Sequence, residues 1–408
     1  MSTNQEILTN NIPTVESVET RAGAKRALFL STTAFAVSFA VWGLVAALAP
    51  TFTQLYGLTA TQKSVMIAVP VLLGSVGRLF AGLLADRFGG RLVFSALLVF
   101  SAIPAAAIGL SNSYPQLIAF GLLLGVAGTT FPVGVGFTSK WFPKEKQGTA
   151  LGVYGMGNIG QSIAVFFAPV LALWLADWRA VFFIFGAASL VWGVVFYFTA
   201  RDFSTTTERK SLAENLSVLK HSATAWVLSL FYFLTFGCFV ALALYMPTFL
   251  REIFQLSPTD AGARTAGFVV LATVMRPVGG SLADKLGGSK VLVFVFAAIA
   301  VLAPLLSLAL IVPFTIGALG CAAALGLGNG AVFKLVPQYF PKETATVTGL
   351  VGAFGGLGGF FPPIELGLVK DSTGSYTIGF LLLSAFSVIC LAVNYFFFMR
   401  GERADASV

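Results

Sequence analysis

Two arginines, Arg78 and Arg276, lie in otherwise apolar stretches of the chain, and each precedes an aspartate, Asp86 or Asp284, by eight residues. A guanidinium group is permanently charged and rich in N–H donors, so such a pair suits an anion. At about 1.5 Å per helical residue, each arginine lies roughly 12 Å from the loop that carries its aspartate. The half-thickness of a bilayer's hydrocarbon core is about 15 Å. We therefore predict an anion site near mid-membrane, where a charge without a function is rarely retained.

A structural role is the alternative for both arginines, with their charge tied to helix-end carbonyls or to the loop aspartates. A direct pair of Arg78 with Asp86 is not expected, because neighbours on a helix surface are three or four residues apart. Of the 17 acidic residues, Glu365 alone approaches the membrane interior, near the outer end of its span. The missing negative charge is therefore expected to arrive with a transported anion.

The composition places most of the chain in lipid. Its 408 residues are 57% hydrophobic and 10% charged, which excludes a soluble domain of this length. The one histidine, His221, lies in a polar loop, and Cys238, Cys321 and Cys390 are isolated in apolar stretches. These residues do not form a metal-ligand set, a disulfide framework or a nucleophile–base pair. We therefore expect an all-α membrane protein with no metal, no cofactor and no enzymatic activity.

Apolar runs of membrane-spanning length predict twelve transmembrane helices in two pseudo-symmetric bundles of six. They run near 26–50, 64–84, 91–111, 115–139, 147–175, 178–200, 223–250, 264–283, 290–311, 314–338, 345–369 and 376–399. The predicted domain plan is a disordered cytoplasmic tail (1–24), an N-terminal bundle (25–200), a cytoplasmic linker (201–222), a C-terminal bundle (223–400) and a cytoplasmic tail (401–408).

Positive charge is concentrated on one side of this plan. Seventeen of the 25 lysines and arginines fall in loops and tails on the side that carries both termini, and five fall in loops of the other side. The positive-inside rule therefore predicts cytoplasmic termini and a multi-pass protein of the cytoplasmic (inner) membrane. The net charge of +8 reflects this topology and does not indicate nucleic-acid binding. We expect a monomer in the lipid bilayer.

The two halves are sequence repeats. The Arg78 segment and its loop recur 198 residues later, and Phe-Pro-Lys-Glu at 142–145 recurs at 340–343 with the same offset. Parallel six-helix repeats are the plan of a major facilitator, whose substrate site lies between the halves. The stretch 82–91 resembles the signature loop of that superfamily. The residues of this loop and of its second copy that we expect to act in conformational change are Gly82, Asp86, Arg87, Gly89, Asp284 and Gly287.

Glycine-rich runs occupy corresponding positions in the fifth and eleventh spans, at 152–160 and 349–359. Glycine lets helices approach closely, which predicts a narrow pathway suited to a small solute. Asn158 is the polar side chain of its run, and it either bonds a neighbouring helix or faces the solute. Lys334 lies about 10 Å from the next loop, and it either snorkels to the cytoplasmic interface or adds a third positive charge to the inner pathway.

With these segments, nearly the whole chain resembles the nitrate/nitrite porter family of the major facilitators, whose two nitrate signatures are similar to the glycine-rich runs. The resemblance implies transport of nitrate, nitrite or both. It assigns substrate binding to two arginines, an asparagine, a tyrosine hydroxyl and two aromatic walls, namely Arg78, Arg276, Asn158, Tyr232, Phe131 and Phe236. Without the resemblance, 40 phenylalanines make any single one uninformative.

Repulsion between the arginines of an empty site favours exchange of nitrate for nitrite, because the loaded carrier would cross more easily than the empty one. Proton symport stays open, since Lys334 or Glu365 could titrate and the family contains proton-linked members. A carrier for another small anion, such as formate or oxalate, is the alternative function. A nitrate sensor would need a signalling domain, and a membrane enzyme would need a catalytic constellation.

Overall fold

The computed structural model describes residues 22–58, 60–203, 222–256 and 258–399. The predicted tails (1–24 and 401–408) and the predicted linker (201–222) lie wholly or mostly outside these ranges. The first half begins with a helix at Ala24, and its last helix ends at Thr199. The second half begins with a helix at Ala223.

Helices make up nearly all of the described chain. The first half contains α1 (Ala24–Ala47), α2 (Ala49–Tyr56), α3 (Ala60–Phe88), α4 (Gly90–Gly109), α5 (Tyr114–Leu124), α6 (Thr130–Ser139), α7 (Gln147–Gly155), α8 (Ile159–Trp174) and α9 (Trp178–Thr199). The second half contains α11 (Ala223–Tyr232), α12 (Cys238–Phe254), α13 (Pro258–Leu286), α14 (Gly288–Leu302), α15 (Ile311–Tyr339), α16 (Thr344–Thr373) and α17 (Thr377–Asn394).

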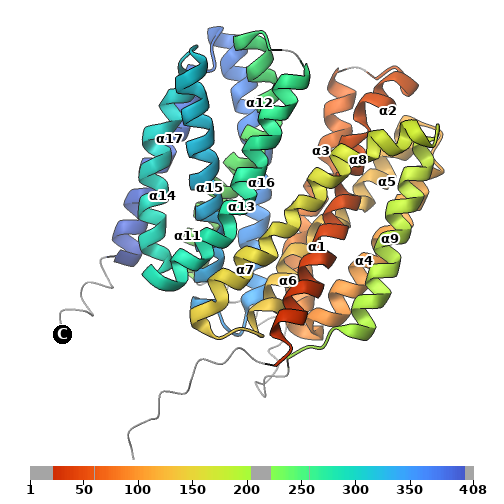
Figure 1. The fold of residues 1–408 in the computed structure, drawn as a ribbon, viewed down its shortest axis with the longest axis horizontal. Coiled ribbons are helices and arrows are strands. Elements are labelled where there is room, and N and C mark those ends of the chain that lie inside the picture. Colours follow the sequence, from red (N-terminus) through yellow and green to blue (C-terminus); the bar gives the residue numbers. More distant parts are fainter. Residues whose placement is uncertain (1–21, 59, 204–221, 257, 400–408) are drawn as a thin grey trace, which may run out of the picture.

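The helices form two bundles, one from each half of the chain (Figure 1). Within the described residues, twelve helical segments are long and apolar enough to cross a membrane, six in each half. The bundles lie closest where α7 and α13 meet, and they diverge towards α2 and α12 (Figure 1). The predicted all-α fold with twelve spans in two bundles is thus confirmed.

Three spans that carry predicted site residues are not continuous α-helices. The fourth contains a 3₁₀ turn at Gly125–Thr129, the fifth a 3₁₀ turn at Met156–Asn158, and the seventh a π turn at Phe233–Gly237. Each turn contains glycine, which destabilises a helix interior by roughly 1 kcal/mol relative to alanine. Such turns redirect side chains and are frequent at functional sites. The apolar runs predicted the spans but gave no sign of these interruptions.

Glycine contacts bring the halves together at the end where α3 and α13 finish, which we call the loop end. Here α3 packs against α16, and α7 packs against α13. A Cβ atom at Gly82 would overlap the backbone of Ala345, and one at Gly280 would overlap the backbone of Gly148. Gly82 and Gly280 are repeat counterparts, so each half makes the same close backbone contact with the other.

We predict that Gly280→Ala opens the loop end, because its methyl group would collide with the backbone of Gly148. Overpacking of this kind costs about 1–3 kcal/mol, which would raise the open population about 5- to 150-fold. The measurement is the distance distribution between spin labels on the exposed residues Glu145 and Lys285. The control is Gly267→Ala, whose Cβ would meet nothing within 4 Å. Equal distributions in the two variants would contradict the prediction.

Candidate anion-binding site

Arg78 of α3 is buried where the two halves meet, with 1% of its surface exposed. Its Nε donates a hydrogen bond to the carbonyl oxygen of Gly128 at 3.1 Å, within its own half. Its Nη1 donates to the carbonyl oxygen of Gly352 in α16 at 2.8 Å. A Cβ at Gly352 would lie 3.1 Å from the Cδ of Arg78, so the glycine leaves room for the arginine stem. One guanidinium therefore spans both halves.

Arg276 of α13 makes the corresponding contact from the second half to the first. It is 3% exposed, and its Nη1 donates to the carbonyl oxygen of Gly155 in α7 at 3.2 Å. When the amide oxygen of Asn158 faces Arg276, this oxygen accepts hydrogen bonds from both terminal nitrogens, from Nη2 at 2.8 Å. Asn158 thus contacts the arginine of the other half, and the structure brings these two predicted site residues together.

Aromatic rings surround the two guanidinium groups. The Cζ of Arg78 lies 5.6 Å from the ring centroid of Phe236, and the Cζ of Arg276 lies 5.4 Å from the same centroid. Phe131 is 5.9 Å from the Cζ of Arg78. These distances fall within the range of cation–π attraction. Phe236 therefore connects the two arginines.

Tyr232 completes the aromatic group that the sequence predicts. Its ring is nearly parallel to that of Phe131, with an interplanar angle of 4° and centroids 6.4 Å apart. It is also parallel to the ring of Phe236, at 7° and 4.9 Å. Tyr232 is buried, with 1% of its surface exposed. All six predicted substrate-binding residues therefore belong to one cluster between the halves.

Four aromatic residues that the sequence analysis missed extend this cluster. Phe333 meets both Phe131 and Tyr232 edge-on, with centroids 4.8 and 4.6 Å away. The hydroxyl of Tyr154 donates to the carbonyl oxygen of Phe131 at 3.0 Å and so anchors that segment. The other two rings flank one arginine each, Phe39 beside Arg78 and Phe239 beside Arg276. Tyr154 lies inside the first glycine-rich run, and that position was the available sequence signal.

The positive charge of the two arginines is not neutralised by a carboxylate within the described part of the chain. Among the described residues, Arg264 pairs with Asp260 and Lys334 pairs with Asp284, and neither pair includes Arg78 or Arg276. Carbonyl and amide oxygens satisfy some of the guanidinium donors but carry only partial charge. The side chain of Glu365 lies outside the described residues. The site therefore presents two charges and unused N–H donors at the interface between the halves.

The site is closely packed. A cavity of about 10 Å³ lies beside Arg276, which is room for about one water molecule. Its lining residues come from both halves: Phe131, Leu151, Gly152, Gly155, Arg276, Asn329, Gly330 and Phe333. An anion that enters here must therefore be small, or the helices must move apart.

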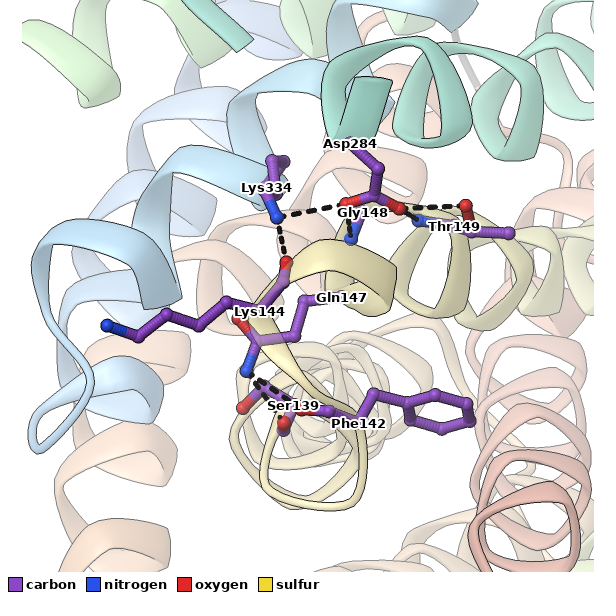
Figure 2. A network of polar contacts seen from close by, with 8 residues as sticks. All are labelled: Ser139, Phe142, Lys144, Gln147, Gly148, Thr149, Asp284 and Lys334. Carbon is purple, nitrogen blue, oxygen red and sulfur yellow. Dashed lines mark hydrogen bonds and ion pairs between the residues drawn. The ribbon is translucent and has the colours of Figure 1, made fainter. Parts of the chain in front are cut away.

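The two loop aspartates bind backbone N–H groups of the opposite half at the loop end. Asp86 accepts from the backbone nitrogen of Thr346 at 2.7 Å, at the start of α16. Asp284 accepts from the backbone nitrogens of Gly148 and Thr149 at 2.8 and 2.7 Å, at the start of α7, and from the Thr149 hydroxyl at 2.8 Å (Figure 2). A carboxylate at a helix N-terminus satisfies donors that the helix leaves unpaired and complements its dipole. Both aspartates thus hold the loop end together.

The other residues of the predicted conformational motif have distinct roles. Gly89 and Gly287 adopt φ angles of 93° and 92°, positive values that glycine accommodates without strain and other residues rarely adopt. These two glycines let the chain turn from α3 into α4 and from α13 into α14. Arg87 is exposed, with its Cζ 5.3 Å from the ring centroid of Phe88. Gly82 makes the interhelical contact described above.

Lys334 does not snorkel to the interface, contrary to one of the two roles expected for it. It is 7% exposed, and its Nζ lies 2.9 Å from an oxygen of Asp284. The same ammonium donates to the carbonyl oxygen of Lys144 in the other half (Figure 2). The Lys334 ammonium binds the Asp284 carboxylate instead of water, because this buried carboxylate lies within reach and needs a counter-ion. The repeat counterpart of Lys334 is Gly136, so this ionic link exists at one of the two related positions.

We predict that Lys334→Met raises the population with an open loop end by at least about tenfold, because it leaves a buried carboxylate without its counter-ion. Methionine retains an unbranched stem and removes the ammonium group. The spin-label pair on Glu145 and Lys285 would report the change. The matched control is Lys290→Met, which removes an exposed lysine of the same half. The prediction fails if both variants give the wild-type distribution.

Comparisons with known proteins agree with this architecture. A model of the Major Facilitator Superfamily matches residues 30–363 and 249–407. Two solved structures share the fold at low sequence identity. The human organic anion transporter MFSD10 (TETRAN) superposes with a TM-score of 0.77 at 15% identity, over 92% of this chain and 100% of that one. The Escherichia coli fucose:proton symporter FucP superposes with a TM-score of 0.74 at 16% identity, over 92% and 99%.

Curated relatives are far more similar in sequence. The "Nitrite extrusion protein" of Bacillus subtilis (strain 168) is 41% identical over 361 residues, covering 88% of this chain and 90% of the relative. The "Probable nitrate transporter NarT" of Staphylococcus epidermidis is 37% identical over 89% and 94%. The "Probable nitrate/nitrite antiporter NarK1" of Thermus thermophilus is 34% identical over 89% of each chain. The chain therefore belongs to the major facilitator superfamily and, within it, to the nitrate/nitrite porter family.

Proposed function

We propose that this protein transports nitrate and nitrite across the cytoplasmic membrane by alternating access. The observation that carries the proposal is the pair of buried guanidinium groups, Arg78 and Arg276, one from each half and neither bound to a carboxylate of the described residues. The relatives named for nitrate and nitrite transport support the choice of anion. A transporter needs no catalytic step, so we infer no enzymatic activity.

In the proposed site, the anion lies between the two arginines, and each guanidinium offers it N–H donors. Asn158 orients Arg276 and supplies its amide to the anion's surroundings. The Tyr232 hydroxyl is a further donor, and Phe131 and Phe236 form aromatic walls. Flat rings suit a flat ion, and they exclude water, which strengthens the electrostatic attraction. Sugars and peptides would need a wider cavity with many more polar groups.

We place the loop end on the cytoplasmic side of the inner membrane, with both termini in the cytoplasm. The support is the excess of lysine and arginine in loops and tails on that side. In this orientation, the contacts of Asp86, Asp284 and Lys334 close the inner gate. The site then opens to the cytoplasm when these contacts separate. We propose that the protein works as a monomer, because one chain supplies both arginines.

The proposed transport mode is exchange of nitrate for nitrite. Without an anion, the two guanidinium groups repel each other across the interface between the halves. A bound anion attracts both arginines and stabilises the arrangement in which the halves are close, so the loaded protein changes state more readily than the empty one. Lys334 is paired with Asp284 in the described structure, which supports a gating role for it over proton transfer.

We predict that Arg78→Lys and Arg276→Lys each lower kcat/KM for nitrate uptake by about 10- to 100-fold. Lysine keeps the charge but loses the planar fork and one hydrogen bond to the anion, and a hydrogen bond to a charged group contributes about 1.5–3 kcal/mol. Uptake of labelled nitrate into proteoliposomes would measure the loss. Arg179→Lys, at an arginine that bonds loop carbonyls outside the site, is the control. Full activity in both site variants would contradict the bidentate arginine site. Competition by oxalate or formate as strong as that by nitrate would instead favour a carrier for small anions in general.

We predict that nitrate uptake depends on nitrite or nitrate inside the vesicle and is insensitive to an imposed pH gradient. The reason is that the empty carrier, with its unscreened arginine pair, returns slowly. Vesicles preloaded with nitrite should take up nitrate at least about tenfold faster than vesicles preloaded with sulfate, since about 1.4 kcal/mol of repulsion already gives a factor of ten. Uptake that a pH gradient drives without internal nitrate or nitrite would instead establish proton symport.

A further inference from the structure

Asn329 of α15 is a buried amide whose two polar atoms lack hydrogen-bond partners. It is 2% exposed, and neither Nδ2 nor Oδ1 contacts a donor or acceptor of the described residues. No other described residue has two such atoms in its side chain. An unpaired buried polar group is costly, so a partner that the protein itself does not provide is expected at some stage of its function.

Asn329 lines the small cavity beside Arg276, and Arg276 contributes an unpaired donor of its own. Its Nη1 bonds Gly155, but its Nε is buried without a partner among the described residues. Two residues that line the cavity therefore carry unpaired N–H donors of different kinds, the charged Nε–H of Arg276 and the neutral Nδ2–H of Asn329. Two donors without a fixed acceptor suit an oxyanion.

The repeat relation supports a functional position for Asn329. It lies 198 residues after Phe131, the same offset that relates Arg78 to Arg276, and Phe131 lines the same cavity. The two halves thus present different chemistry at equivalent positions, an aromatic ring in one and an amide in the other. The close packing of Gly330 against the backbone of Arg276 fixes Asn329 beside that arginine.

The cavity lies between Arg276 and the loop end. Lys334 follows Asn329 by five residues on α15, so Asn329 lies about 7.5 Å farther from the loop-end contacts than Lys334 does. By the same measure, Arg276 lies about 12 Å from Asp284. Asn329 is thus positioned between the arginine pair and the ion pair that closes the loop end.

We propose that Asn329 and the Nε–H of Arg276 form a second binding station for the transported oxyanion, on the cytoplasmic side of the arginine pair. This inference rests on the proposed nitrate and nitrite transport. In the closed structure the space beside Arg276 suffices for about one water molecule. When α7 and α13 separate at the loop end, the anion moves from between the arginines to Asn329. It keeps one bond to Arg276 while Nδ2 donates the other.

The test is Asn329→Leu, which keeps a similar volume and removes both hydrogen-bonding atoms. In proteoliposomes of known orientation, we expect the half-saturation concentration for nitrate offered on the cytoplasmic side to rise about 10- to 100-fold, the effect of losing one hydrogen bond to an anion. On the opposite side it should change less than about threefold, because the arginine pair is intact. The melting temperature of the variant should equal or exceed that of the wild type, since an unpaired amide has been removed.

Asn394→Leu is the matched control. Asn394 is a fully buried asparagine of the same half, and its Nδ2 donates to the carbonyl oxygen of Ser289 at 2.9 Å, outside the site. It should lower the melting temperature and leave the half-saturation concentrations on both sides unchanged. If Asn329→Leu also lowers the melting temperature and leaves both half-saturation concentrations unchanged, Asn329 holds a structural water and the proposal of a second station is wrong. If Asn329→Leu does not accumulate, Asn329→Ser, which keeps one small donor, should still raise the cytoplasmic value selectively.

The wild-type protein separates this inference from the proposed function. If the wild type exchanges nitrate for nitrite and Asn329→Leu keeps the wild-type constants on both sides, the second station is overturned and the transport function stands. If the wild type does not transport either anion, the proposed function itself fails. Asn329→Asp is a direct electrostatic test. A carboxylate at this position would repel the anion, so this variant should exchange nitrate for nitrite more slowly than Asn329→Leu.

Discussion

The structure depends on two positive charges that it buries between its halves without a fixed counter-charge. In a medium of low dielectric constant, an unpaired guanidinium is unfavourable, and repulsion between two of them adds to this cost. The protein reduces the cost with partial charges: the carbonyls of Gly352 and Gly155, the amide of Asn158 and the faces of several aromatic rings. The net charge remains, which makes a bound anion the natural complement of the site.

Each arginine bonds a carbonyl of the opposite half, so the proposed anion binding and the contact between the halves involve the same groups. The glycines of α7 and α16 make these contacts reachable, because a side chain at Gly152 would collide with the backbone at Arg276, and one at Gly349 with the backbone at Arg78. Separation of the halves would break both guanidinium–carbonyl bonds. The site is therefore coupled to the conformational change through hydrogen bonds and needs no separate transmitting element.

The two halves resemble each other in the aspartate contacts at the loop end, and they differ at the position of Lys334. Asp86 and Asp284 each accept hydrogen bonds from backbone N–H groups at the N-terminus of a helix of the opposite half, α16 and α7 respectively. Lys334, whose counterpart is Gly136, adds an ionic link at one of these positions. The two halves thus use the same kind of contact at the loop end, and one half adds a lysine that forms an ion pair there.

Much of this protein was determined by its sequence alone. Apolar runs fixed the spans because lipid admits few alternatives to a long helix, and the constant offset of 198 residues established the repeat. The depth of Arg78 and Arg276 predicted an anion site. Only the tertiary structure decided which groups surround that site. It paired Lys334 with Asp284 instead of water, turned Asn158 towards Arg276, and left Asn329 unpaired. These outcomes depend on contacts between helices distant in the chain and on short 3₁₀ and π turns, neither of which local hydropathy encodes.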